Sequence, residues 1–148
     1  MLPSTTERVS AHTATAVNQQ IRRQAEARLA YFAARPAEIP ARLAELDREW
    51  DIERALEANA SSLALVGVVL GATQDRRWLA LPALIATFLF QHALQGWCPP
   101  VPILRRLGFR TATEIEHERQ ALKALRGDFA HVQQAENRAA AAFQAARV

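Results

Sequence analysis

The residues most capable of chemistry lie in the stretch FLFQHALQGWCPP, residues 88–100. His92 could exchange a proton near neutral pH, and Cys98 could carry sulfur or act as a nucleophile. Proton transfer needs a partner group, and the two uncharged segments around His92 contain no Asp or Glu. We therefore expect His92 to be a hydrogen-bonded residue of the structure.

Two interpretations of Cys98 stay open. It is either a small residue at the break after a helix, or a thiol that exchanges sulfur with a separate sulfurtransferase. As the only cysteine, it can form neither an internal disulfide nor a thiolate cage for a metal ion. The C-terminal end of a helix does not lower the pKa of a thiol, which disfavours the reactive thiolate.

Two long uncharged segments position these residues, one over residues 58–74 and one over residues 78–104. A membrane-spanning helix needs about 20 apolar residues. At about 1.5 Å per residue, a helix from Trp78 to Trp97 is about 28 Å long, close to the roughly 30 Å hydrocarbon layer. Tryptophan favours membrane interfaces, so Trp50, Trp78 and Trp97 are predicted interfacial anchors.

The two segments are joined by the short sequence TQDRR and are predicted to insert together as a helical hairpin. Small residues allow the backbones of two helices to approach closely in lipid. The first segment carries four such residues at steps of three or four, and they form its predicted packing face: Ala60, Ala64, Gly67 and Gly71.

The second segment carries a polar stripe composed of Thr87, Gln91 and Gln95, with His92 beside it. An antiparallel hairpin brings this stripe level with Asn59, Ser61 and Ser62. Amide–hydroxyl bonds between the two helices would satisfy polar groups that lipid cannot. The stripe therefore predicts a contact with the first helix or with a second subunit.

The segments on both sides of the hairpin are predicted to be helical, so the sequence predicts an all-α protein. Residues 1–13 are predicted to form a flexible tail, residues 14–57 cytoplasmic helices, residues 58–104 the membrane hairpin, and residues 105–148 C-terminal cytoplasmic helices. The helix predicted around residues 14–34 packs either on the protein or on an anionic leaflet. The helix predicted after Pro40 has no stop signal before residue 58 and is expected to continue into the hairpin. The alanine-rich C-terminus is expected to close the chain as one helix.

The charge pattern gives an orientation and excludes some partners. Three arginines precede the first span and three follow the second, whereas the connecting loop has two, partly countered by Asp75; this excess favours termini in the cytoplasm. The arginines are Arg42, Arg48 and Arg54 before the first span, Arg105, Arg106 and Arg110 after the second, and Arg76 and Arg77 in the loop. The net charge of +3 is too small, and the basic residues too dispersed among apolar segments, for a nucleic-acid interface. The chain shows no nucleophile beside a base and no glycine-rich phosphate loop. We therefore expect a non-enzymatic protein without a cofactor or metal ion.

Two short motifs resemble a known family. Glu53-Arg54 precedes the first segment, and Gly96-Trp97-Cys98-Pro99 ends the second. Over about residues 48–111 the chain resembles the small bacterial inner-membrane proteins of unknown function called DUF2892, or the YgaP-like transmembrane domain. The resemblance implies a hairpin in the bacterial inner (cytoplasmic) membrane. Some relatives fuse it to a rhodanese that carries a persulfide, whereas this chain has no second cysteine for that role.

The sequence thus predicts a multi-pass membrane protein that acts as an interaction or assembly subunit, with the lipid bilayer and a second copy or a membrane complex as partners. Two alternatives differ in class. In the first, the protein is an accessory in membrane-associated sulfur handling through Cys98. In the second, it is a soluble helical bundle that buries residues 60–97 in its core.

Overall fold

The computed structural model describes residue 4 and residues 6–147 of the chain, and this part is all-α, with 77% helix and no strand. The prediction of an all-α protein is confirmed. The chain divides into two compact units, each made of two segments. The first unit holds Met1–Ile21 and Trp50–Ala112, and the second holds Arg22–Glu49 and Thr113–Val148.

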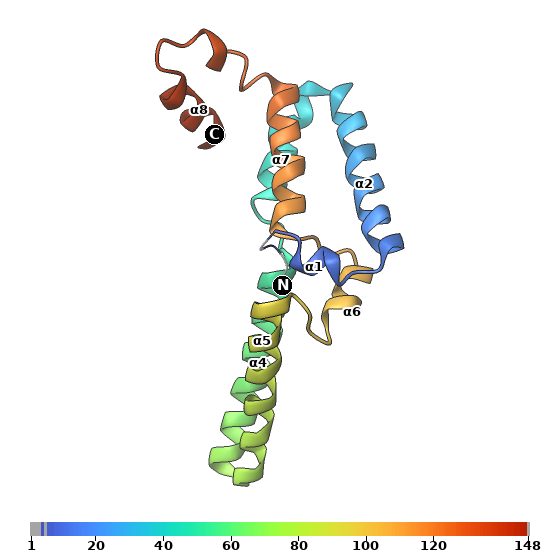
Figure 1. Ribbon diagram of the computed structural model, residues 1–148, viewed down its shortest axis with the longest axis vertical. Helices are drawn as coiled ribbons and strands as arrows, with labels where there is room; N and C mark the ends of the chain where they lie inside the picture. The colour runs from blue at the N-terminus through green and yellow to red at the C-terminus, as the bar shows by residue number, and fades with distance from the viewer. Residues whose placement is uncertain (1–3, 5, 148) are drawn as a thin grey trace. The chain divides into compact units, whose positions relative to one another are not determined.

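The first unit is built on an antiparallel pair of long helices, drawn side by side in Figure 1. They are α4 (Ile52–Thr73) and α5 (Ala80–Gln95), joined by the 3-10 helix η2 (Arg76–Leu79). Asp51 begins α4, since its side chain accepts a hydrogen bond from the backbone N–H of Arg54 at 2.7 Å. α5 ends at Gly96, whose φ of 77° suits the left-handed cap that glycine favours.

Two glycines allow α4 and α5 to approach closely. A Cβ atom on Gly67 would lie 2.6 Å from Cδ of Pro82, and one on Gly71 would lie 2.6 Å from Cδ2 of Leu79. Both glycines are buried, and Ala60 and Ala64 on the same face are half-buried. The two glycines therefore pack against α5 and η2 of the same chain, which leaves this part of the predicted small-residue face closed to a second copy.

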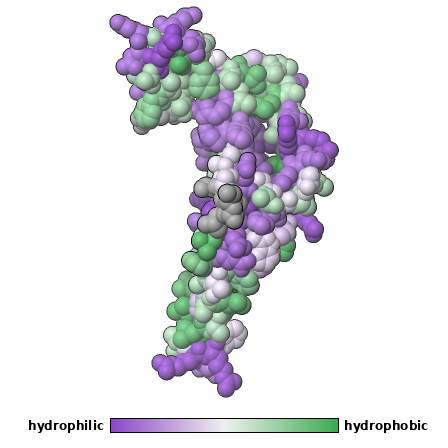
Figure 2. Space-filling view, viewed as in Figure 1, coloured by the Kyte–Doolittle hydropathy of each residue, from purple (hydrophilic) through white to green (hydrophobic). Residues whose placement is uncertain are grey.

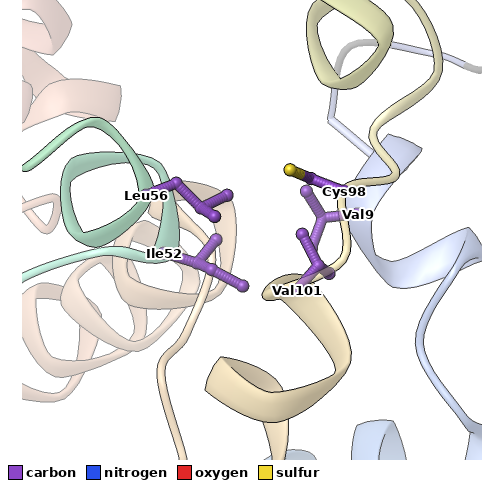
Figure 3. Close-up of a cluster of buried hydrophobic side chains, with 5 residues drawn as sticks. All are labelled: Val9, Ile52, Leu56, Cys98 and Val101. Carbon is purple, nitrogen blue, oxygen red and sulfur yellow. The ribbon is translucent and has the colours of Figure 1, made fainter. Parts of the chain in front are cut away.

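Two short helices pack at the end of α4 and α5 away from their connection: α1 (Arg8–Ala11) and α6 (Val101–Arg106). Figure 3 shows the cluster that joins them, in which Cys98 points across a small core toward Leu56. Its members each expose 5% of their surface or less: Val9, Ile52, Leu56, Cys98 and Val101. Burying an aliphatic side chain contributes about 1.5–3 kcal/mol, so this cluster stabilises the unit.

The second unit has a core of its own. It contains most of α2 (Thr15–Ala33), with η1 (Pro36–Glu38), α3 (Ile39–Leu46), α7 (Ala112–Arg126), η3 (Val132–Gln134) and α8 (Arg138–Arg147). Leu29 and Phe32 of α2 pack against a cluster formed by Ile39, Leu43, Leu46, Ile115 and Leu122. This contact supports the interpretation in which α2 packs on the protein. Gly127, with a φ of 90°, ends α7, because glycine readily adopts the left-handed conformation of a helix cap.

Three local predictions differ from the structure. Within the predicted tail 1–13, Arg8–Ala11 is helical and Val9 is 3% exposed, because Val9 belongs to the core of the first unit; residues 1–3 and 5 lie outside the described part. The helix expected to run unbroken into the hairpin stops at Leu46 and restarts at Ile52 behind the Asp51 cap. The C-terminal helix is interrupted between η3 and α8.

Candidate functional site: a polar cluster at the end of the hairpin

Three ionisable side chains meet where α4 begins and α5 ends. The Glu53 carboxylate lies 2.7 Å from Nε2 of His92 through one oxygen. Its other oxygen accepts a hydrogen bond from Nη2 of Arg8 at 3.1 Å. Nη1 of Arg8 also donates to the carbonyl oxygen of Ala93 at 3.2 Å. This Arg8–Glu53–His92 cluster joins three helices that are distant in sequence.

The helix termini suit the residues that lie there. Glu53 lies in the first turn of α4, where the helix dipole stabilises a negative charge. His92 lies in the last turn of α5, where an imidazole interacts favourably with the free carbonyl groups. Arg8 comes from α1, and its backbone lies so close to Gly96 that a Cβ there would stand 2.5 Å from the Arg8 carbonyl carbon. Glycine at position 96 therefore lets α1 rest on the end of α5.

The hydrogen bonds define the chemical state of His92. A carboxylate only accepts hydrogen bonds, so Nε2 carries the proton that is donated to Glu53. Nδ1 is buried and finds no hydrogen-bond partner among the described residues. The Arg8 charge then balances the Glu53 charge. This arrangement can hold α1 on the hairpin without leaving a net buried charge.

The prediction of the hydrogen-bond partner of His92 was wrong. We expected it to be satisfied among glutamines and hydroxyl groups, and Glu53 fills that role instead. Glu53 lies before residues 58–74, the predicted first span, and therefore outside the two segments in which a partner is expected. It enters the hairpin because α4 begins at Ile52. An Asp at position 51 with an acidic residue in the following turn is a helix-start signal that could have revealed this.

The amide–hydroxyl bonds predicted between the helices are absent from the described residues. Ser61 and Ser62 each donate to the carbonyl oxygen of Ala58 on their own helix. Thr87 donates in the same way to the carbonyl oxygen of Ala83. Serine and threonine commonly bond back to the preceding turn, which satisfies the hydroxyl without a second helix. Asn59 is exposed and lies at the surface.

The polar stripe faces away from α4. Thr87 and Gln95 are exposed and Gln91 is half-buried, whereas the neighbouring His92 is only 5% exposed. Successive residues of a helix point about 100° apart, so His92 can face α4 while the stripe beside it stays largely at the surface. The stripe is thus an outer surface of the hairpin and is available for a contact beyond this chain.

Cys98 is a core residue in this structure. It is 5% exposed, lies next to Leu56 and Val101, and follows the glycine that ends α5. Burial raises the pKa of its thiol. Both observations suit the interpretation of Cys98 as a small residue fitted at a break, and both disfavour rapid sulfur exchange.

The three tryptophans lie at the two ends of the hairpin. Trp78 is in η2 at the connecting turn and is 47% exposed. Trp50, 46% exposed, precedes α4 and stacks under the Arg54 guanidinium, 4.5 Å from the ring centroid. Trp97 follows α5 and is half-buried. The predicted anchors therefore bracket α4 and α5, one at the turn and two at the opposite end.

The outer surface of α4 and α5 is apolar. In the most hydrophobic 18-residue stretch of Ile52–Thr73, 11% of the residues are buried. In the corresponding stretch of Arg76–Gln95, 6% are buried. Leu65 is 65% exposed and Phe90 67% exposed. Figure 2 shows this hydrophobic surface along the hairpin, with a hydrophilic end at the turn. By length and composition both helices are able to cross a membrane.

The chain was compared with protein-family models, with curated proteins and with solved structures, and none of the three comparisons finds a match.

Proposed function

We propose that this protein is a small integral membrane protein that acts as a non-enzymatic assembly subunit, anchored by the α4–α5 hairpin. The observation that carries the proposal is the exposure of the two most apolar helices of the chain. A water-soluble protein buries such surface, because about 25 cal/mol of stabilisation is lost for each Å² of apolar area left in water. A bilayer covers it instead.

The soluble-bundle alternative requires residues 60–97 to be a buried core. Leu65, Val66 and Val69 each expose at least 50% of their surface, and Leu84 exposes 54%. Such values are typical of side chains that face lipid rather than a protein interior. The placement of all three tryptophans at the hairpin ends adds to this argument.

The orientation that we propose follows from the arginines. α1 and the segment after α5 meet at one end of the hairpin, where Arg8 and Arg54 lie together with Arg105 and Arg106 of α6. The positive-inside rule places this end in the cytoplasm. Under this proposal both termini lie on the cytoplasmic side of the membrane, and the resemblance to DUF2892 implies that this is the bacterial inner membrane.

The proposed assembly partner is a second copy of the chain, and the contact uses the polar stripe. Gly67 is already covered by Pro82 of α5 and Gly71 by Leu79 of η2, so this part of the small-residue face is not available. Gln91 and Gln95 form no side-chain hydrogen bond with the described residues. A glutamine amide both donates and accepts, so two copies related by a two-fold axis can pair their stripes directly.

Membrane placement is tested by fractionation and vesicle labelling. Because Cys98 is buried, the labelled thiols are introduced in a Cys98→Ala background at two exposed positions, Gln74→Cys in the turn and Glu116→Cys in α7. We expect the protein in carbonate-washed membranes. An impermeant maleimide should label Glu116→Cys only in inside-out vesicles and Gln74→Cys only in right-side-out vesicles. Recovery of the protein in the soluble fraction would refute the proposal.

Self-association is tested separately, by light scattering of the purified protein in mild detergent. Gln91→Leu should shift the protein toward the monomer, because it removes the amide in the middle of the stripe. The control Phe90→Leu alters a neighbouring exposed residue outside the stripe and should leave the mass unchanged. A wild-type monomer at every accessible concentration would refute the second-copy contact while leaving the membrane placement intact.

A further inference from the structure

A groove runs between α4 and α5 beside Cys98. It has a volume of about 190 Å³. Its walls come from both helices and from the turn after α5, and the residues that shape it include Leu56, Ala60, Leu63, Phe88, Cys98 and Pro99. Part of its floor is therefore the small core of Figure 3, to which Leu56 and Cys98 belong. We propose that this groove binds one acyl chain of a membrane phospholipid.

The lining selects an apolar occupant. None of the described residues that line the groove is charged, and Asn59 is the only amide among them. An extended peptide would need a partner for each buried N–H and C=O group, and this lining cannot provide them. A phosphate or another polar headgroup finds no cation in the groove. An acyl chain carries no polar group beyond its ester and loses nothing by entering.

The volume matches part of a single chain. An engineered cavity of about 150 Å³ lined by Leu, Ile and Phe binds benzene, a molecule of six carbons. A groove of about 190 Å³ therefore holds a segment of comparable length, and the remainder of the chain extends outside it. This limit favours one chain of a two-chain lipid over a bulky fused-ring lipid.

The groove opens onto the surface that the proposed function assigns to lipid. Leu63 lines the groove and is 49% exposed, and the outer positions Leu65 and Val66 continue the apolar surface along α4. A lipid in contact with this surface can insert one chain sideways without leaving its leaflet. The inference rests on membrane placement, but it adds a defined site that a uniform lipid-facing surface does not require.

The experiment uses the full chain in vesicles of phosphatidylethanolamine and phosphatidylglycerol, with a trace of phosphatidylglycerol that carries a diazirine on one acyl chain. After irradiation, mass spectrometry of peptides locates the crosslink. We expect labelling concentrated on peptides that contain the groove residues Leu56, Phe88 and Cys98. Mass spectrometry of the intact protein, released from detergent under native conditions, should show one retained phospholipid.

Two variants fill the groove by different routes. Asn59→Trp starts from an exposed position on the rim, so its ring can cover the groove without disturbing the core. Ala60→Leu adds bulk from the wall itself. Each should lower lipid retention about tenfold, which corresponds to the displacement of about two methylene groups. The matched control Ser62→Trp adds the same ring at an exposed position outside the lining and should leave retention unchanged.

The outcomes separate this inference from the proposed function. Loss of every variant and the wild type from membranes would refute the hairpin placement. A membrane-bound wild type with crosslinks spread evenly over α4 and α5 would overturn the groove site alone. Equal loss of retention in Asn59→Trp and Ser62→Trp would do the same, because it would reflect a general effect of tryptophan. Crosslinks to groove peptides that Asn59→Trp and Ala60→Leu suppress and Ser62→Trp leaves unchanged would establish the site.

Discussion

Replacing one carboxylate should disrupt the second unit. The Glu118 side chain is completely buried on α7 and interacts with two arginines from other helices. Arg28 of α2 donates to it through Nη2 at 2.8 Å and through Nε at 3.1 Å. Arg42 of α3 donates through Nε at 3.0 Å. Glu118→Gln keeps the shape of the side chain but removes the charge that both guanidinium groups face.

The expected cost follows from the burial of the three partners. Removing one member of a buried ion pair costs about 3–5 kcal/mol, because the remaining charge stays uncompensated. Arg28 and Arg42 keep side-chain exposures of 31% and 16%, so water can solvate part of their charge. We therefore expect Glu118→Gln to lower the free energy of unfolding of this unit by about 2–3 kcal/mol.

Arg42 cannot relieve the change by releasing a proton. Burial lowers its pKa, but hydrogen bonds to Glu118 and Glu45 more than offset that effect, and the net pKa is raised. Even after the loss of Glu118, an arginine stays charged at every pH used in practice. The variant must therefore accommodate two guanidinium groups around a neutral amide, which can accept a hydrogen bond through only one oxygen.

The assay is thermal unfolding of the full chain in detergent, followed by far-UV circular dichroism. One kcal/mol shifts the midpoint by about 4–8 °C for a unit of 60–100 residues, so the expected drop is about 10–20 °C. Hydrogen exchange should show the loss of protection in α3 and α7. The control Glu116→Gln changes a carboxylate on the same helix that is 51% exposed and should shift the midpoint far less.

A triple variant tests the cause of the destabilisation. Arg28→Met, Arg42→Met and Glu118→Leu together remove the buried Glu118 charge and the two guanidinium charges that face it, and such apolar replacement of a buried ion cluster is often neutral. Glu45 and Glu49, which also pair with Arg42, keep side-chain exposures of 60% and 27%. The triple variant should recover most of the lost stability. If Glu118→Gln unfolds at the wild-type temperature, or if the triple variant is no better than the single one, the account of Glu118 as a buried charge between two arginines is wrong.

Three further predictions concern the hairpin unit. Gly67→Ala places a Cβ 2.6 Å from Pro82 and should destabilise the hairpin by about 1–3 kcal/mol, measured as faster proteolysis within α4, whereas the exposed Val68→Ala should not. Glu53→Gln should release α1, which would be seen as faster amide exchange over residues 8–11. The exposed variant Glu57→Gln should leave that exchange unchanged. Equal exchange rates in the two variants would contradict the role of the Arg8–Glu53–His92 cluster in holding α1. Burial raises the pKa of the Cys98 thiol in the folded chain, so the folded state favours the protonated thiol more than the unfolded state does. The stabilisation that results should be constant below the ordinary thiol pKa of about 8.5 and should decline as the pH rises through the higher pKa of the folded state. Cys98→Ala should abolish this decline, and iodoacetamide should modify the native wild type at least tenfold more slowly than the denatured chain.

The hairpin partners could be predicted from the sequence, but the residues that contact each other could not. Uncharged runs and small residues at helical spacing identify α4 and α5 by local composition alone. The rotation of each helix about its axis depends on how both side-chain sets interdigitate. That rotation directs His92 toward α4 and leaves Gln91 and Gln95 more exposed. The spacing of polar residues along one helix does not determine this rotation.

The same limit applies to contacts between distant segments. Arg8 and Glu53 are 45 residues apart and Arg28 and Glu118 are 90 residues apart, so no local pattern indicates either pair. In the sequence each reads as an ordinary charged residue on a solvated face. The structure shows Glu118 to be completely buried and Glu53 to bridge two helices.

The sequence by itself determined the helical class, the two uncharged segments and the glycine stop of α7, because these depend on composition and on backbone preferences over a few residues. The tertiary structure decided that the Gly67–Gly71 face closes the hairpin, that Cys98 is buried rather than exposed, and that Glu53 is the partner of His92. These features depend on which surfaces meet after the chain has folded, and the free energy of such contacts belongs to pairs of segments rather than to either segment alone.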